Sequence, residues 1–229
     1  MPSALVTGGS SGIGLAIARA LREDGYDLTV ASRTREKVER AADGLGALAV
    51  VADVASEDDC VRLVAQHRER HGGLDVLVNS AGVGFGGTIA SLETRHLDLM
   101  LGVNLRGLLL VTREAAPLLA EAKGWVFNLA SVAATVPTPG LAVYGATKAA
   151  VVALTRSQNL ELEDAGVRAV ALCPGFVDTP MAAWTGLATD EMIAPEDCAE
   201  VVRMCLRLSP RARIPQVVIE RSGSSRAPA

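Results

Sequence analysis

Short β-rich runs alternate with longer helical patterns along the whole of this 229-residue chain. The apolar runs, such as SALVTG, ALAVVADV and VRAVALCPG, are nearly continuous in Val, Leu and Ala, which is typical of strands buried on both faces. Strict alternation of strand and helix predicts a parallel sheet with right-handed crossovers. Seven strand candidates therefore predict an α/β fold, in which one doubly wound sheet of about seven strands lies between two helical layers.

The size and composition of the chain fit one domain that spans residues 1–229. The sequence is 49% hydrophobic and 21% charged, which is enough for a core and excludes disorder. Only 3% of the residues are aromatic, so Ala, Val and Leu must fill that core. We see no internal repeat and no linker. The terminal SGSSRAPA, residues 222–229, is expected to be mobile or to pack on a partner subunit.

Several classes of function are excluded or disfavoured by the charge and the cysteine pattern. The net charge is −4 and no basic stripe is present, so nucleic-acid binding is not expected. No apolar run approaches the roughly 18 residues of a membrane span. The first strand candidate begins within three residues of Met1, which leaves no room for a signal peptide. Four scattered cysteines without CxxC pairs indicate reduced thiols, and we expect a cytoplasmic protein.

A histidine pair is the one pattern that could suggest a metal. His67 and His71 are four residues apart in QHRERHG, but their neighbours are charged and the HExxH order is absent. We interpret the pair as a solvated helix end, and we expect no metal site.

A glycine-rich turn, TGGSSGIG (Thr7–Gly14), lies between the first strand candidate and the first helix candidate. Glycines permit a tight turn and a close backbone approach, and a helix N-terminus offers free N–H groups to a pyrophosphate. A turn that needs positive φ explains one or two of these glycines but not all four. The position at the first strand–helix junction favours a dinucleotide site.

The end of the second strand candidate, in ASRTREK, carries no acid. In NAD sites a carboxylate there accepts a hydrogen bond from the ribose 2′-hydroxyl. Ser32 and Arg33 stand at this position instead, with Arg35 and Lys37 just beyond. A hydroxyl and a guanidinium suit a 2′-phosphate, because Arg binds phosphate through a forked, charge-assisted contact. The pattern favours NADP(H) over NAD(H).

The run YGATK, Tyr144–Lys148, opens a helical pattern and pairs two rare residues. The chain has two tyrosines and three lysines against nineteen arginines. Residues four apart share one helix face, so the phenol and the ammonium should lie one above the other. A lone YxxxK is most often a partly buried Tyr over a solvated Lys. The other motifs must decide whether this pair is instead a proton donor beside the charge that tunes it.

An ordered set of motifs resembles the short-chain dehydrogenase/reductase family across nearly the whole chain. Ser131 lies thirteen residues before Tyr144, the usual separation in that family, whereas Ser80 replaces the second Asn of its NNAG motif. One such motif is weak evidence, but the ordered set is specific. The motifs are TGGSSGIG, ADV (Ala52–Val54), NSAG (Asn79–Gly82), GVNLRG around Asn104, NLAS, YGATK and CPGFVDTPM.

The resemblance implies a Rossmann-like fold, a nicotinamide cofactor and a catalytic set. That set is Asn104, Ser131, Tyr144 and Lys148. In the family the Lys also holds the nicotinamide ribose, and the Asn backbone anchors a water in a proton relay. The expected cofactor contacts are Gly8, Ser10, Ser11, Gly12, Ile13, Gly14, Ser32, Arg33, Asp53, Val54, Asn79, Ala81, Gly82, Tyr144, Lys148, Pro174, Gly175, Val177 and Thr179.

The chemistry supports these implied roles. Hydride delivered to a ketone or aldehyde leaves negative charge on oxygen, which the site must stabilise or protonate. Ser131 can orient that oxygen and Tyr144 can donate the proton. A free phenol has a pKa near 10, a poor match to neutral pH, and a nearby ammonium lowers the pKa of a phenol. We therefore expect Lys148 to tune Tyr144.

Substrate identity depends on segments with little sequence signal. Candidate pocket positions are Val83 to Phe85, Ala133, Val136 to Thr138, Phe176, and Met181 to Ile193. They are mostly apolar and include no Arg or Lys, which indicates a small, neutral carbonyl compound or alcohol. The segment after Thr179 is short for the family, and the C-terminal VVIERSGSS lacks the family's GG motif.

Two classes of function remain open at this point. The first is an NADP(H)-dependent oxidoreductase, with NAD(H)-dependent alcohol oxidation as its variant. The second is a non-catalytic regulator that senses the cofactor, because a fold alone does not give function. Intact Ser131, Tyr144 and Lys148 favour the enzyme. We also expect a homodimer or homotetramer, as is common in the family.

Overall fold

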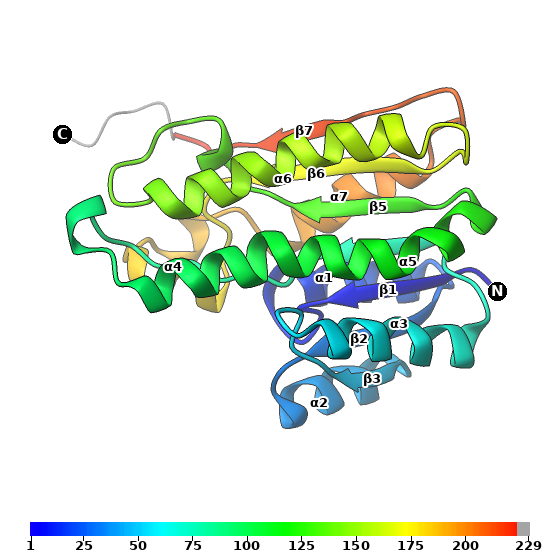
Figure 1. Ribbon diagram of the computed structural model, residues 1–229. Coiled ribbons are helices and arrows are strands. Elements are labelled where there is room, and N and C mark those ends of the chain that lie inside the picture. Colours follow the sequence, from blue (N-terminus) through cyan, green and yellow to red (C-terminus); the bar gives the residue numbers. More distant parts are fainter. Residues whose placement is uncertain (224–229) are drawn as a thin grey trace.

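One seven-stranded sheet forms the centre of the computed structural model, which describes residues 1–223 (Figure 1). All neighbouring strands are parallel, in the order β3-β2-β1-β4-β5-β6-β7. This confirms the predicted fold. Most of the tail predicted to be mobile, residues 222–229, lies outside the described residues. The strands are β1 (Ser3–Thr7), β2 (Asp27–Ser32), β3 (Leu48–Val51), β4 (Val76–Asn79), β5 (Trp125–Leu129), β6 (Arg168–Pro174) and β7 (Gln216–Ile219).

Helices cover both faces of the sheet and complete three layers (Figure 1). One face packs against α1, α2 and α7, and the other packs against α3, α5 and α6. The helices are α1 (Gly12–Glu23), α2 (Arg35–Leu45), α3 (Glu57–His71), α4 (Thr94–Leu101), α5 (Leu108–Ala122), α6 (Ala142–Glu161) and α7 (Pro195–Leu206). Five shorter helical turns are η1 (Ile89–Ser91), η2 (Gly102–Gly107), η3 (Val132–Ala134), η4 (Pro180–Thr185) and η5 (Thr189–Glu191).

The central strands bury every residue, as their uninterrupted apolar runs predict. All side chains of β1, β4 and β5 are buried, because helices lie on both sides of the sheet. Alternate residues of β6 contribute to the hydrophobic cores on opposite faces of the sheet. Val170 and Leu172 face α1 and α7, whereas Ala171 and Cys173 face α6. Small side chains in these positions let the helices approach the sheet closely.

The strand order reverses at β1, which pairs with β2 on one side and β4 on the other. In open parallel sheets, ligands bind in the crevice outside the carboxyl ends of the strands at such a reversal. The loops after β1, β4, β5 and β6 all leave the sheet at this edge, because all strands are parallel. The sequence motifs are therefore brought together at one edge.

His67 corrects one interpretation made from the sequence, that of a solvated helix end. Its side chain is completely buried, and Nδ1 lies 2.9 Å from the Thr29 hydroxyl while Nε2 lies 2.9 Å from the carbonyl oxygen of Gly73. The carbonyl can only accept, so Nε2 carries the proton and Nδ1 accepts from Thr29. Burial, with some repulsion from His71, lowers the pKa of His67 to about 4. His67 is thus a neutral core residue that joins α3 to β2.

Within residues 1–223, no helix is both long enough and apolar enough to cross a bilayer. The same residues hold no cluster of three or more His, Cys, Asp or Glu side chains placed to bind a metal ion.

Candidate active site

The glycine turn after β1 requires residues without side chains at Gly8 and Gly14. Gly8 has φ of +66°, and a Cβ there would lie 2.8 Å from the backbone nitrogen of Ala81. A Cβ on Gly14 would lie 2.5 Å from the carbonyl oxygen of Gly8. The turn therefore brings bare backbone to the start of α1, where free N–H groups and the positive helix end attract a pyrophosphate. This cradle fits a dinucleotide cofactor.

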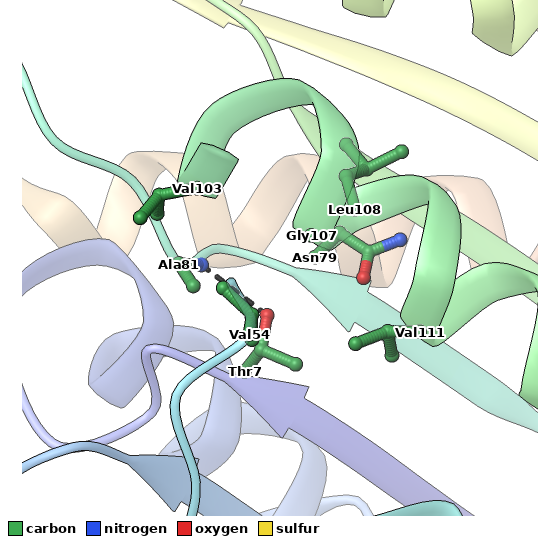
Figure 2. A pocket seen from close by; sticks show the side chains of 8 residues that line it. All are labelled: Thr7, Val54, Asn79, Ala81, Val103, Gly107, Leu108 and Val111. Carbon is green, nitrogen blue, oxygen red and sulfur yellow. Dashed lines mark hydrogen bonds between the residues drawn. The ribbon is translucent and has the colours of Figure 1, made fainter. Parts of the chain in front are cut away.

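A buried hollow at this edge lies among the ends of β1 and β4, the loop after β3, and the η2–α5 segment (Figure 2). Thr7, at the end of β1, accepts a hydrogen bond from the Ala81 backbone at 3.2 Å, which fixes the loop after β4 against the glycine turn. Val54 and Gly107 also line the hollow, and a Cβ on Gly107 would lie 2.8 Å from the Val54 side chain. The lining residues are Thr7, Val54, Asn79, Ala81, Val103, Gly107, Leu108 and Val111. The residues around this hollow pack against one another and so set the distance between the loops after β1, β3 and β4.

Ser32 and Arg33 stand at the end of β2, beside the glycine turn. The Arg33 side chain is exposed, and among the described residues it makes no ion pair, whereas Arg35 pairs with Glu39 at 3.0 Å. The Ser32 hydroxyl donates to the Thr34 carbonyl at 3.4 Å. Gly9 donates to the carbonyl of Ala31, so the turn and this strand end are in contact. Within residues 1–223, Arg33 is thus an exposed cation without an ion pair at this corner, as is Lys37.

Asp53 and Val54 follow β3 on the same edge. An Asp53 carboxylate oxygen accepts from the Ala55 backbone at 3.0 Å, and the Asp53 backbone donates to Asp59 at 2.8 Å. Val54 is buried beside Gly107. These contacts fix the loop, and they leave Asp53 partly exposed at the edge.

Asn79 lies at the end of β4, but its side chain is turned away from the loop edge. The amide nitrogen donates to the Thr112 hydroxyl at 3.0 Å and to Asn128 at 2.9 Å. Asn128 in turn donates to Thr155 and Gln158 of α6. The side chain therefore belongs to a buried polar network that ties β4 and β5 to α5 and α6. Any cofactor contact of Asn79 falls to its backbone.

Asn104 lies in the π-helical turn η2, between α4 and α5. Its side chain makes a two-way clamp on Val83: Oδ1 accepts from the backbone nitrogen at 2.8 Å, and Nδ2 donates to the carbonyl at 2.9 Å. Nδ2 also donates to Thr147 of α6 at 3.2 Å. A π-turn of this kind interrupts the regular helical ladder and is frequent at functional sites. Asn104 thus holds the loop after β4 next to α6.

Ser131 and Tyr144 lie together at the start of α6. The Ser131 hydroxyl accepts from the Ala133 backbone at 3.2 Å and lies 3.4 Å from the carbonyl of Pro174. Burial raises the pKa of Tyr144, and a hydrogen bond from Ser131 opposes that rise. The net direction is upward, opposite to the lowering expected from Lys148, because burial is the largest cause. The phenol is therefore held protonated beside a hydroxyl.

Lys148 lies one helical turn beyond Tyr144 and is 4% exposed. Its Nζ donates to the carbonyl of Leu129 at 2.6 Å and lies 5.7 Å from the centre of the Tyr144 ring. Burial lowers the pKa of Lys148 to about 8. The tyrosine and lysine are thus stacked as the spacing predicted. The amine is buried, not solvated, so the ordinary surface interpretation of YxxxK is wrong.

The segment after β6 completes the edge. Thr179 packs on the glycine turn, since a Cβ on Gly12 would lie 2.9 Å from its methyl carbon. Val177 is buried and pairs with Ile193, and Gly175 donates to the carbonyl of Ile219 at 2.9 Å. Pro174 faces Ser131 through its carbonyl. The predicted residues of this motif therefore stand between the glycine turn and Ser131.

Three groups that hold site residues in position were not predicted from the sequence. The Leu129 carbonyl and Thr147 depend on how α6 docks, which no spacing encodes. Asn128 pairs with Asn79 through the register of β4 and β5. Its polar side chain inside an apolar strand was a signal that could have indicated it.

The fold and this edge define a Rossmann-type, nicotinamide-dependent oxidoreductase, and comparison with known proteins agrees. Residues 2–188 match the short chain dehydrogenase family, and the chain belongs to that family. An uncharacterized oxidoreductase of Staphylococcus epidermidis is 36% identical over 222 residues, which cover 94% of this chain and 95% of that protein. The protein is accordingly an NAD(P)-dependent short-chain dehydrogenase/reductase that acts on CH–OH groups.

Two solved structures resemble the whole fold. An alcohol dehydrogenase of the archaeon Thermococcus sibiricus, complexed with 5-hydroxy-NADP, superimposes with a TM-score of 0.91 at 31% identity, covering 100% of both chains. A 3-ketoacyl-(acyl-carrier-protein) reductase of Brucella melitensis, complexed with NADH, gives a TM-score of 0.88 at 31% identity, covering 96% of both chains. The fold thus accepts either nicotinamide dinucleotide, and the choice rests on residues of this chain.

Proposed function

We propose that this protein is an NADP(H)-dependent oxidoreductase that interconverts a carbonyl and an alcohol on a small, neutral substrate, with Tyr144 as the acid and base. The observation that carries the proposal is the buried Lys148, whose Nζ lies 5.7 Å from the centre of the Tyr144 ring, with Ser131 near enough to the phenol to oppose the rise of its pKa. A buried amine with no carboxylate partner is unfavourable for folding. Its retention at the one edge where the loops converge indicates a chemical role.

The site residues divide the work of reduction. When bound, the reduced nicotinamide supplies a hydride to the carbonyl carbon. Ser131 donates to the carbonyl oxygen and orients it. Tyr144 gives its proton to that oxygen as negative charge develops there, and the same phenol takes the proton back in the oxidation direction. Because burial raises the pKa of Tyr144, the phenol is in the protonated form that reduction needs at neutral pH.

Lys148 and Asn104 support that proton transfer. The ammonium of Lys148 favours the phenolate that forms when Tyr144 has given up its proton. We propose that the same amine would hold the nicotinamide ribose hydroxyls of the bound cofactor. Asn104 uses its side chain on Val83 and Thr147, so its contribution to a proton relay would come from its backbone.

The cofactor preference rests on Arg33. This guanidinium is exposed, unpaired among the described residues, and adjacent to the glycine turn, where the 2′-position of an adenosine ribose would lie. Arg binds phosphate through paired hydrogen bonds, and no acid is present to accept from a free 2′-hydroxyl. The T. sibiricus enzyme carries an NADP derivative and the B. melitensis enzyme carries NADH, so overall likeness does not decide between them.

The remaining cofactor contacts follow from position on the edge. Gly8, Gly12 and Gly14 would take the pyrophosphate, and Thr179 with Gly175 would flank the nicotinamide. The others proposed to contact the cofactor are Ser10, Ser11, Ile13, Ser32, Asp53, Val54, Asn79, Ala81, Gly82, Tyr144, Lys148, Pro174 and Val177.

A Tyr144→Phe variant tests the proposal. We expect NADPH-dependent reduction of a simple activated ketone to fall by at least about a hundredfold, because general acid catalysis contributes about 10²–10⁴-fold. NADPH binding, followed by nicotinamide fluorescence, should be retained. Tyr26→Phe is the matched control, since Tyr26 is the other tyrosine and packs near α1. Full turnover in Tyr144→Phe would overturn the assignment, and full biological activity without turnover would favour a cofactor sensor.

A further inference from the structure

Three of the seven aromatic residues of this chain lie on loops at the catalytic edge. They are Phe85 after β4, and Phe176 and Trp184 after β6. The chain is poor in aromatics and fills its core with aliphatic side chains, so this concentration is not a consequence of composition. Large apolar side chains left in water at a cleft mark a surface that another apolar group covers.

Phe176 and Trp184 form one pair on the segment after β6. Their rings meet edge to face, with centroids 6.0 Å apart and planes at 84°. Phe176 remains 38% exposed and Trp184 66% exposed. Most of Phe176 is buried, whereas most of Trp184 is exposed, so the pair still presents aromatic surface to solvent. Because aromatic rings favour edge-to-face or offset-stacked contacts with one another, a further aromatic ring can pack favourably on this exposed surface.

The base of this segment is fixed, which sets where the pair stands. Ile193 donates to the carbonyl of Phe176 at 3.0 Å, and Asp178 donates to the carbonyl of Ile193 at 2.9 Å. Two residues before Phe176, the Pro174 carbonyl faces the Ser131 hydroxyl. On the other side, Thr179 packs on Gly12 of the glycine turn. The start of this segment, with Phe176, therefore lies between Ser131 and the glycine turn, and Trp184 reaches it through its ring contact with Phe176.

The loop after β4 carries the third of these aromatic residues, Phe85, whose ring already has a stacking partner. Phe85 stacks on His96 with centroids 4.0 Å apart and planes at 9°. Next to it, a Cβ on Gly84 would lie 3.4 Å from the Tyr144 ring, so the loop after β4 closes on the tyrosine. This loop limits the space beside Tyr144 from one side. The exposed aromatic surface belongs to the pair after β6.

The charges of the loops around the proposed site limit the class of substrate further. Residues 83–92, 132–141 and 176–193 include no Lys or Arg. Arg95, the nearest cation along the first loop, is paired with Glu93 at 2.8 Å. A carboxylate, a phosphate or an acidic carrier protein would find no counter-ion in these three loops. Asp178 adds a negative charge at the base of the segment, which further disfavours anions.

We infer that Phe176 and Trp184 are specificity-determining residues that hold an aromatic ring attached to the reacting carbonyl, so that the preferred substrates are uncharged aryl ketones and aryl aldehydes. This inference rests on the proposed function, because the ring is placed relative to Tyr144 and Ser131. The pair recognises the ring, while Ser131 and Tyr144 act on the carbonyl oxygen.

A matched pair of activated ketones tests this inference. Trifluoroacetophenone and trifluoroacetone differ by a phenyl in place of a methyl. We expect the wild type to prefer the phenyl ketone in kcat/KM by at least about tenfold with NADPH. In Trp184→Ala and Phe176→Leu, that preference should fall by about tenfold while kcat/KM for trifluoroacetone changes by less than about threefold. Trp184→Phe should restore most of the preference.

Control measurements distinguish a failure of this inference from a failure of the proposed function. Met204→Ala removes an exposed apolar side chain of α7, away from these loops, and should leave the preference unchanged. An unchanged preference in Trp184→Ala and Phe176→Leu, or an equal kcat/KM of the wild type on both ketones, would overturn the inference while leaving the proposed function in place. No NADPH binding and no turnover of either ketone would overturn both.

Discussion

The ammonium nitrogen of Lys148 lies 5.7 Å from the centre of the Tyr144 ring, one helical turn along α6. The same nitrogen donates to the carbonyl of Leu129 at 2.6 Å, so β5 holds the amine in place beside the Tyr144 side chain. Neither contact involves a carboxylate. The molecule thus keeps an uncompensated buried amine at the place where its loops converge, and this arrangement gives the first prediction.

Lys148→Met should stabilise the protein while abolishing its activity. Burial places the pKa of Lys148 at about 8 in the folded chain, below the 10.5 of the unfolded chain. Between these values the unfolded chain binds more protons, so stability rises with pH there, and the full penalty is present below pH 8. Removing the amine should raise the free energy of unfolding at pH 7 by about 1–3 kcal/mol.

Urea unfolding at pH 7 and again near pH 11 checks this prediction. The gain of Lys148→Met over the wild type should shrink at the higher pH, where the wild-type amine is neutral in both states. Lys123→Met is a control on an exposed lysine. A variant less stable than the wild type at pH 7 would show that the Leu129 contact outweighs the desolvation of Lys148.

His67 should make the protein lose stability in mild acid. Its pKa is about 4 when folded and 6.5 when unfolded, so the unfolded chain binds the extra proton between these values. Stability is therefore full above pH 6.5 and falls as the pH drops toward 4, by at most roughly 3 kcal/mol. His71, whose pKa is also lowered by burial, acts in the same direction. The check is the urea midpoint from pH 7.5 to 4.5 for the wild type and His67→Gln, which should have the shallower slope. Equal slopes would assign the acid sensitivity to other groups.

Gly14→Ala should disrupt the turn that we assign to the cofactor. The new Cβ would lie 2.5 Å from the Gly8 carbonyl oxygen, and only a backbone shift can relieve that contact. We expect NADPH affinity to fall by more than about tenfold and the free energy of unfolding to fall by about 1–3 kcal/mol. Gly44→Ala is the matched control in α2, because nothing lies within 4 Å of its Cβ position. That control should gain up to about 1 kcal/mol with unchanged binding. Normal NADPH affinity in Gly14→Ala would place the pyrophosphate elsewhere.

Asn104→Ala should lower kcat more than it raises KM for the ketone. The amide holds both backbone groups of Val83 and also the Thr147 hydroxyl, so its loss leaves buried polar groups unpaired. We expect about 1–3 kcal/mol of lost stability and a misplaced loop beside Tyr144. Asn104→Asp keeps one acceptor and loses both donors, and it should be intermediate in kcat. A change confined to stability, with kcat unaltered, would make Asn104 purely structural.

Much of the fold was predictable because its strands are buried on both faces. Seven apolar runs predicted seven strands, and each strand falls inside its run. The segment around Asn104 was less clear, since residues 91–124 read as one continuous helical pattern. The structure divides them into α4, η2 and α5, because Asn104 turns to clamp Val83. That break depends on a residue 21 positions away, which no local pattern reveals.

His67 shows a prediction that the sequence allowed but that we missed. Arg68, Glu69 and Arg70 suggested a solvated helix end. Cys60, Leu63 and Val64 precede His67 by seven, four and three residues, the spacing of one buried helix face, and all three are buried. The orientation of Asn79 was beyond the sequence, because its partners Thr112 and Asn128 come from other elements and meet it only through the strand register.

Titration of the purified protein with NADPH and, separately, with NADH tests the central claim most directly. The readout is the change in nicotinamide fluorescence, with Arg33→Ala run beside the wild type and Arg35→Ala, a neighbouring exposed arginine paired with Glu39, as the control. The account predicts that NADPH binds the wild type at least about tenfold more tightly than NADH, and that only Arg33→Ala loses this preference. Equal or tighter binding of NADH would contradict the assignment of Arg33, and binding of neither would contradict the account as a whole.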